Sequence, residues 1–180
     1  MKQLFFFIIT VLITTASFAQ TAEDTADGLF HDDLLNHLVG KWNASGMIHG
    51  NPFTWDIEAQ WVMNHQYLRI DEKSREVVPW LNVQYEGMYF IGYNHNSKRY
   101  VVHEMSVKGD ADQTEAPYYA YRTGAELKLV EPWTSGSDTV TVQRFTWEPA
   151  SGSWHIVGRL VIAGKEGDVL GDMRLVAAKQ

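Results

Sequence analysis

Seven histidines are the side chains with the widest chemical repertoire in this chain, because imidazole binds metals and transfers protons near neutral pH. None of them belongs to an H-x-H or HExxH pair, spacings at which two imidazoles can share a metal. His103 and His155 lie in strand-like segments beside apolar residues, where a buried imidazole needs a hydrogen-bonding partner. Both are candidate binding residues, and the alternative is a core or rim histidine that a neighbour satisfies. The chain has no cysteine, which excludes thiolate sites, and we predict no metal site.

Charged and aromatic residues within strand-like segments are the next candidates. An arginine inside a ligand pocket can neutralise a carboxylate or phosphate through paired hydrogen bonds, and the alternative is an outward arginine in an ion pair. A carboxylate in mid-strand can do acid–base work, and the alternative is a solvated outer face. Aromatic residues at period-two spacing can line a cavity or fill a core. We predict a ligand site formed by His103, Glu104, Arg122, His155, Arg159 and Tyr89, and assign no catalytic residue.

Several classes of function are excluded by what the sequence lacks. It has no G-x-S-x-G nucleophile motif, no P-loop and no dinucleotide fingerprint. Its formal net charge is -7, with lysines and arginines scattered along the chain, whereas nucleic-acid binding needs a basic patch. We therefore predict no nucleic-acid partner and no cofactor, and a small molecule as the partner.

The segments that must position these residues alternate with period two, as strands do. The clearest runs over 53–63, and about nine or ten such segments follow one another at spacings of 8–14 residues. Short turns such as Asn94–Ser97 join them, so neighbours should pair antiparallel and the sheet should close to hide its edges. Apolar residues at helical spacing over 30–39 predict a short helix before Gly40, and 72–81 is predicted to be a charged loop. The sequence thus predicts an all-β fold, a single antiparallel β-barrel with a short N-terminal helix.

The first residues have the three parts of a secretory signal peptide. Lys2 supplies a positive charge, 4–13 is apolar, and Ser17-Phe18-Ala19 places small residues at a cleavage site. The apolar run is too short to span a bilayer, so we predict no membrane anchor after cleavage. The expected organisation is a signal peptide over 1–19, a flexible leader over 20–29 and the barrel over 30–180. The protein is then exported, to the periplasm or out of the cell.

Gly40-Lys41-Trp42, which opens the first strand after the short helix, resembles the hallmark of lipocalin-like (calycin) barrels. More narrowly, Leu38–Trp42, Phe90–Asn94 and Lys98–Val101 are similar to an uncharacterised family of exported bacterial lipocalin-like proteins, and the resemblance spans most of residues 30–178. It implies that Trp42 closes one end of the barrel and that Arg174, on the last strand, packs over it. Gly40, Trp42 and Gly46 also resemble, in part, the glycine-rich opening of a group of haem-binding barrels similar to nitrobindin.

These observations lead to one hypothesis and three alternatives. The hypothesis is an exported barrel that binds a small, largely apolar ligand in its cavity. The first alternative is an enzyme that uses the same cavity, which requires His103, Glu104, His155 and Arg159 to converge. The others are a haem-binding barrel that uses one strand histidine, and a structural or interaction module whose barrel is filled.

Overall fold

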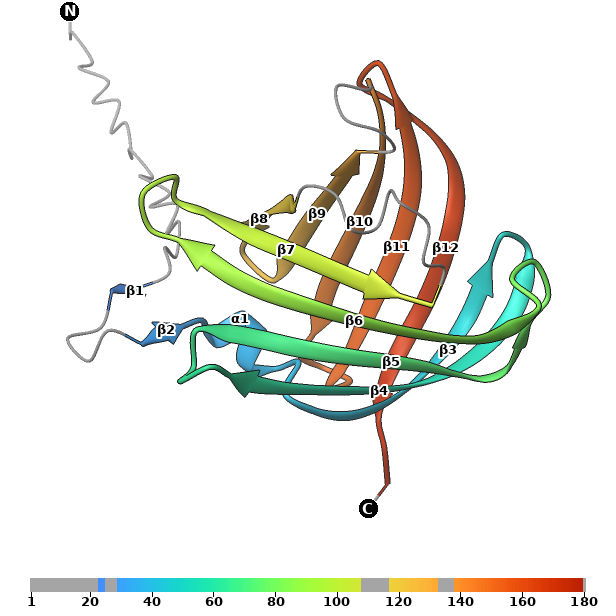
Figure 1. The fold of residues 1–180 in the computed structure, drawn as a ribbon, viewed down its shortest axis with the longest axis horizontal. Coiled ribbons are helices and arrows are strands. Elements are labelled where there is room, and N and C mark those ends of the chain that lie inside the picture. The colour runs from blue at the N-terminus through green and yellow to red at the C-terminus, as the bar shows by residue number, and fades with distance from the viewer. Residues whose placement is uncertain (1–22, 25–28, 108–116, 133–137, 180) are drawn as a thin grey trace, which may run out of the picture.

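A computed structural model gives the structure of the protein and describes residues 23–24, 29–107, 117–132 and 138–179. The expected signal peptide over 1–19 and most of the leader lie outside the described residues. Ten strands form a closed antiparallel barrel (Figure 1), which confirms the predicted fold class. The strands are β3 (Gly40–Ile48), β4 (Asn51–Val62), β5 (Tyr67–Val78), β6 (Val83–Asn94), β7 (Arg99–Ser106), β8 (Tyr118–Thr123), β9 (Glu126–Pro132), β10 (Thr139–Glu148), β11 (Ser153–Ile162) and β12 (Lys165–Ala177).

Each barrel strand pairs with its neighbour in sequence, and the pairing of β12 with β3 closes the wall. Closure leaves no sheet edge open to pairing with another chain. In Figure 1 the strands β5–β7 run across the view whereas β10–β12 run steeply through it, as expected of a strongly twisted sheet. Among the described residues, no helix is long and apolar enough to span a membrane.

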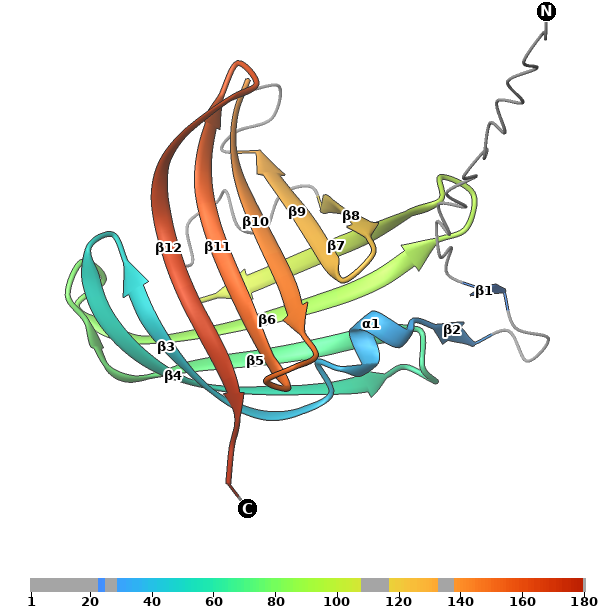
Figure 2. The same cartoon turned by 180° about the vertical axis from the view of Figure 1, so that it is seen from behind.

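One end of the barrel, the closed end, is covered by the segment that precedes β3. This segment contains β2 (Phe30–His31), which pairs with β1 (Glu23–Asp24), and then the helix α1 (Asp33–Asn36). Figure 2 shows α1 at the end of the barrel where β10 ends and β11 begins. Four apolar side chains of the covering segment are buried against the barrel core: Phe30, Leu34, Leu35 and Leu38. The opposite end, where β3 ends and β4 begins, is called the open end below.

The helix is shorter than the pattern over 30–39 predicted. Phe30 and His31 are extended, and Asp32 then caps the helix by accepting a hydrogen bond from the Leu35 backbone N–H at 2.8 Å. An aspartate in this position satisfies a backbone donor that the first turn leaves free. The helix therefore begins at Asp33, after the cap.

The predicted loop over 72–81 is wrong, because β5 continues to Val78. Lys73 and Arg75 alternate with the inward residues Glu72 and Ser74, so they face solvent. They pair with Glu86 and Asp56 on the neighbouring strands. The strand bulges between Lys73 and Val77, where the Ser74 hydroxyl accepts a hydrogen bond from the Tyr85 backbone at 2.8 Å. A bulge lets a strand of mixed composition continue while its register shifts.

Candidate functional site

The barrel encloses a cavity of about 300 Å³ toward its open end. Its wall is mainly apolar and aromatic, with a few polar groups that converge from different strands. This is the usual composition of a small-molecule pocket. The aromatic and apolar lining residues are Trp55, Trp80, Tyr85, Tyr89, Phe145, Ile48, Val78, Leu81, Ile156, Leu170 and Met173, and the polar ones are His49, Glu72, Glu104, Glu131, Thr141 and Gln143.

Trp55 and Tyr85 form one aromatic wall of the cavity. Their rings stack with centroids 4.8 Å apart and an interplanar angle of 15°. Tyr85 lies against Gly87, where a Cβ atom would stand 2.9 Å from the tyrosine ring, so a glycine is needed for this position of the ring. The indole N–H of Trp55 is buried and has no hydrogen-bonding partner within the described part of the chain. A buried donor without an acceptor is costly and calls for an explanation.

Three tyrosine hydroxyls also belong to this end of the barrel. Tyr85 and Tyr89 hydrogen-bond to one another, and the Tyr118 hydroxyl donates to Oε2 of Glu104 at 3.2 Å. Burial raises the pKa of all three phenols, and the charges of nearby glutamates raise these pKa values further. The hydroxyls therefore stay protonated at neutral pH and serve as hydrogen-bond donors.

Three glutamates bring negative charge to the cavity from alternate strands: Glu72 on β5, Glu104 on β7 and Glu131 on β9. All three carboxylates act on the same phenol, since each raises the pKa of Tyr85 by its charge. Neither lysine nor arginine occurs among the described residues that line the cavity. Within those parts of the chain, no three His, Asp or Glu side chains are grouped so as to hold a metal ion.

The mouth of the cavity is formed by two turns at the open end. His49, in the turn after β3, has a φ of 47° and meets Trp80, in the turn after β5, with ring centroids 5.4 Å apart. The two rings are nearly perpendicular, an edge-to-face arrangement that aromatic pairs favour. The entrance is thus framed by two rings.

The closed end holds an ion-pair network in which Arg122 and Asp32 are buried and Asp33 is exposed. Nη1 of Arg122 lies 3.1 Å from Oδ1 of Asp32 and 2.6 Å from Oδ1 of Asp33, and the Tyr100 hydroxyl donates to Asp32. Burial opposes the charge of Arg122, but the hydrogen bond to Asp33 and both carboxylate charges outweigh it and raise the Arg122 pKa. The network ties β8 and β7 to the covering segment, and here Arg122 already has protein carboxylates as partners.

The predicted site residues are divided among three places. Glu104 and Tyr89 line the cavity, while Arg122 lies at the closed end. His103 is exposed on the outside of β7, because side chains alternate along a strand and its neighbour Glu104 points inward.

The other two predicted residues also lie on the outer face of the wall. His155 pairs with Asp172 at 2.8 Å, and Arg159 donates to the Gly167 carbonyl at 3.3 Å. His103, Glu104, His155 and Arg159 therefore do not converge, so the constellation that the enzyme hypothesis required is not assembled.

The two residues expected to close the barrel lie on opposite faces of its wall. Trp42 is buried at the closed end, and its indole N–H donates to the Leu38 carbonyl at 2.7 Å. Arg174 is half-exposed on β12 and donates to Oε2 of Glu148 at 2.5 Å. Arg174 points outward because it alternates with the inward-facing Leu175.

Glu72 and Glu131 were missed as site residues, although the sequence carries a signal for them. Each cavity glutamate is the third inward position of a strand whose first two inward residues are apolar. The three runs are Leu68-x-Ile70-x-Glu72, Tyr100-x-Val102-x-Glu104 and Leu127-x-Leu129-x-Glu131. A carboxylate that continues an apolar face is the exception to the binary pattern of a strand, and exceptions concentrate at functional sites.

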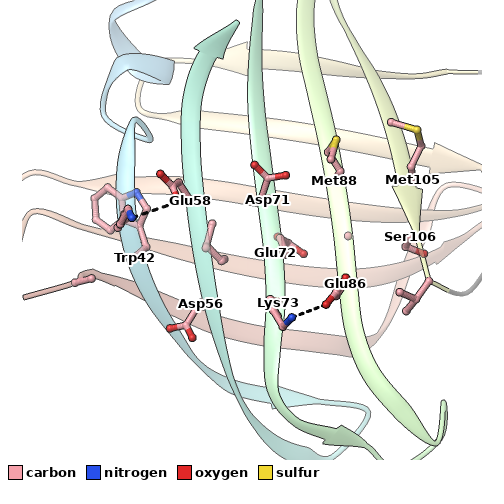
Figure 3. Close-up of a pocket in the computed structure, with 15 residues that line it drawn as sticks. Trp42, Asp56, Glu58, Asp71, Glu72, Lys73, Glu86, Met88, Met105 and Ser106 are labelled. Atoms are coloured by element: carbon pink, nitrogen blue, oxygen red, sulfur yellow. Dashed lines mark hydrogen bonds and ion pairs between the residues drawn. The ribbon is translucent and has the colours of Figure 1, made fainter.

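A larger hollow, of about 710 Å³, lies on the outer face of β3–β7. Figure 3 shows Glu58, Asp71, Met88 and Met105 following one another across its floor. Its charged groups pair across strands, for example Lys73 with Glu86 at 2.5 Å, and both of those side chains are more than half exposed. Solvated ion pairs of this kind leave little unmet demand for a ligand. The interior cavity is therefore the better candidate site.

Among known proteins, no family model matches the chain and no curated protein matches it significantly.

Proposed function

We propose that this protein is an exported lipocalin-like barrel that binds a small, largely apolar molecule in its interior cavity. The observation that carries the proposal is the cavity itself, about 300 Å³ of space walled by aromatic and aliphatic side chains. Ligand pockets range from about 300 to 1,000 Å³, so this one suits a small ligand. A barrel filled by its own side chains, the structural alternative, would leave no such space.

The lipocalin-like part of the proposal is supported by the order of elements. A short covering helix leads into Gly40-Lys41-Trp42 and a closed antiparallel barrel, with the cavity at the end away from the helix. Lipocalins have eight strands, whereas this barrel has ten among its described residues, so the proposal refers to the wider calycin group. Export is supported by the signal-like residues 1–19, and N-terminal sequencing of the protein recovered from cell fractions tests it by locating the cleavage.

The direct test is to purify the protein from its native host, record its native mass spectrum and identify what denaturation releases. Gly158→Val is the variant that fills the cavity, because Gly158 lines it and an added Cβ would meet only ordinary contacts at 3.7 Å. Val157→Ile is the matched control, because Val157 is next to Gly158 in the sequence but its side chain lies on the outer face of β11.

The expected result is one bound small molecule in the wild type and in Val157→Ile, with much less in Gly158→Val. Equal occupancy in Gly158→Val would place the molecule outside the cavity and contradict the proposal. A wild-type protein that carries nothing and takes up no small molecule in solution would favour the filled or structural alternative.

A further inference from the structure

Two glycines leave a stretch of bare backbone on one side of the cavity. Gly158 on β11 and Gly171 on β12 are paired across the two strands, and both line the cavity. Glycine weakens the interior of a strand, because it has no side chain to pack and loses more conformational freedom on folding than other residues. Two glycines side by side on an inward face therefore call for a reason.

Neither backbone conformation nor packing supplies that reason. The pairing of the two strands shifts after Gly158, at Leu170, but neither glycine has the positive φ that favours glycine. A Cβ atom would meet only ordinary contacts, at 3.7 Å from Gly158 and at 3.6 Å from Gly171, whereas one at Gly46 would collide with the Asp172 carbonyl. Glycine that the strand itself does not require marks a place where a ligand approaches the backbone closely.

Trp55, which also lines the cavity, supplies an independent requirement. This side chain is only 8% exposed, and its indole N–H has no hydrogen-bonding partner among the described residues. By contrast, the indole N–H groups of Trp42, Trp61 and Trp154 all donate to the segment that covers the closed end. A ligand atom that accepts a hydrogen bond would satisfy the donor of Trp55.

The phenol beside Trp55 adds a second donor. Tyr85 stacks on Trp55 and hydrogen-bonds to Tyr89. A bond between two hydroxyls uses one of their two hydrogens, so the hydroxyl that accepts keeps its own hydrogen to donate elsewhere. The aromatic side of the cavity therefore presents donors from adjacent rings, and acceptor atoms of a ligand complement them.

The lining of the cavity also bears on the charge of that acceptor. A buried carboxylate or phosphate is usually paired with arginine or lysine, and neither residue type occurs in the described lining. An uncharged acceptor such as a carbonyl oxygen loses less on leaving water, and it needs only hydrogen-bond donors of the kind that Trp55 and Tyr85 carry.

We infer that the ligand is a flat aromatic molecule with an uncharged hydrogen-bond acceptor, such as a carbonyl oxygen, at one edge. Its ring lies over the backbone of Gly158 and Gly171, and its acceptor meets the Trp55 indole N–H. A flat ring contacts a backbone without side chains over its whole face, whereas a puckered ring touches it with fewer atoms. The inference rests on the proposed function, since it names the class of molecule that the same cavity takes.

The test uses five probes of one outline, measured by isothermal titration calorimetry on the full-length mature protein. Acetophenone has the flat ring and the carbonyl acceptor. In α-methylstyrene a methylidene group replaces the carbonyl oxygen, and in cyclohexyl methyl ketone a puckered ring replaces the flat one. Benzoate is an anion of the same shape, and benzamidine is a cation. Acetophenone should bind about fivefold or more tightly than the puckered ketone and the two charged probes.

Variants assign the contacts to the named residues. Trp55→Phe should weaken acetophenone about fivefold relative to α-methylstyrene, because only the ketone loses a hydrogen bond. Trp61→Phe is the matched control, since its indole N–H donates to Asn36 at the closed end, and it should change neither probe. Gly158→Ala should weaken acetophenone several-fold by placing a methyl group where the ring lies. Thermal unfolding of each variant separates lost binding from a lost fold.

A measurement on the wild type makes the test independent of the variants. In a proton–nitrogen correlation spectrum, the indole N–H signal of Trp55 is assigned from its contacts with the Tyr85 ring. Acetophenone should move the indole proton downfield, because a hydrogen bond deshields it, and α-methylstyrene should not. An indole proton that responds alike to both probes would overturn the contact between Trp55 and the acceptor.

The outcomes separate this inference from the function on which it rests. Tightest binding of benzoate or benzamidine would overturn the uncharged acceptor, and equal binding of acetophenone and cyclohexyl methyl ketone would overturn the flat ring. A molecule released from the protein of the native host that lacks an aromatic ring or an acceptor would also overturn the inference. Each of these results leaves ligand binding standing. No binding of any probe, together with a bare protein from the host, would overturn both.

Discussion

The two ends of this barrel differ in the surroundings of their tryptophan indoles and charged side chains. At the closed end, three indole N–H groups donate to the covering segment, and Arg122 meets two aspartates. At the open end, three glutamates line the cavity, and the Trp55 indole N–H has no partner among the described residues.

Under the proposed function, the closed end contributes mainly to stability and the open end mainly to binding. A buried polar group that has a partner within the protein stabilises the folded state, whereas one without a partner destabilises it. Proteins usually tolerate such costs at functional sites, where a ligand supplies the missing partner. Substitutions at the closed end should therefore change the free energy of unfolding most, and substitutions at the open end should change binding most.

The largest expected effect is at the ion-pair network of the closed end. Arg122→Ala leaves the fully buried Asp32 carboxylate without its cation, which should reduce the free energy of unfolding by about 3–5 kcal/mol. Arg144→Ala is the matched control, because its pair with Glu166 is half-exposed, and it should cost about 1 kcal/mol or less. Urea unfolding measures both. Equal losses would mean that the network does not anchor the closed end.

The next effect compares two glycines of the barrel interior. Gly87→Ala would place a Cβ atom 2.9 Å from the Tyr85 ring, so the ring must move, at about 1–3 kcal/mol. Gly158→Ala meets only ordinary contacts at 3.7 Å and should be neutral or slightly stabilising. Thermal unfolding measures the difference. A harmless Gly87→Ala would show that Tyr85 does not need this space and that the cavity wall is adaptable.

A smaller effect compares two tryptophans that are almost equally buried, with Trp42 6% and Trp55 8% exposed. Replacing either by phenylalanine removes similar volume and one indole N–H. Trp42→Phe also breaks the hydrogen bond to the Leu38 carbonyl, so it should cost about 1 kcal/mol more than Trp55→Phe. Chemical denaturation of the two variants measures this difference. Identical losses would indicate that the Trp55 indole is satisfied after all.

The smallest effect is a pH dependence at Asp33. The hydrogen bond from Arg122 lowers the pKa of Asp33 below its ordinary value of 3.8 in the folded state. Stability from this group is therefore present above about pH 4 and is lost as the pH falls through the lowered pKa. The Asp33 side chain is 61% exposed, so Asp33→Asn should cost about 0.5 kcal/mol or less at pH 7.

Urea unfolding of the wild type and of Asp33→Asn between pH 2 and 7 measures this dependence. The two curves should converge at the acid end, because the aspartate is then protonated and the ion pair with Arg122 is gone. Parallel curves over the whole range would show that the pair contributes nothing to stability.

Local patterns sufficed for most of the fold. The alternation over 53–63 falls in β4 except for its last residue, and the turn predicted at Asn94–Ser97 joins β6, which ends at Asn94, to β7. The continuation of β5 through Glu72 was missed, because outward charges on a strand and charges in a loop have the same composition. Of the residues predicted for the ligand site, Tyr89 and Glu104 line the cavity, whereas the cavity residues Glu72 and Glu131 were not proposed.

The direction of each strand face was the main source of error. His103 shares its face with Val101 and Met105, so that face looked apolar, yet it is the outside of β7, where Met105 is 50% exposed. Much of the surface of a folded protein is apolar, so an apolar neighbourhood does not identify the interior. Arg159 and His155 were proposed for the same reason and lie outside as well.

By itself the sequence determined the class of the fold, the limits of most strands and the lack of thiol chemistry, because these follow from periodicity and composition along the chain. Only the tertiary structure decided which face of each strand is the interior, which end α1 covers and that Glu72, Glu104 and Glu131 share one cavity. The physical reason is that inside and outside exist only once β12 pairs with β3 and closes the wall. Closure joins residues from opposite ends of the chain, and no local pattern contains that information.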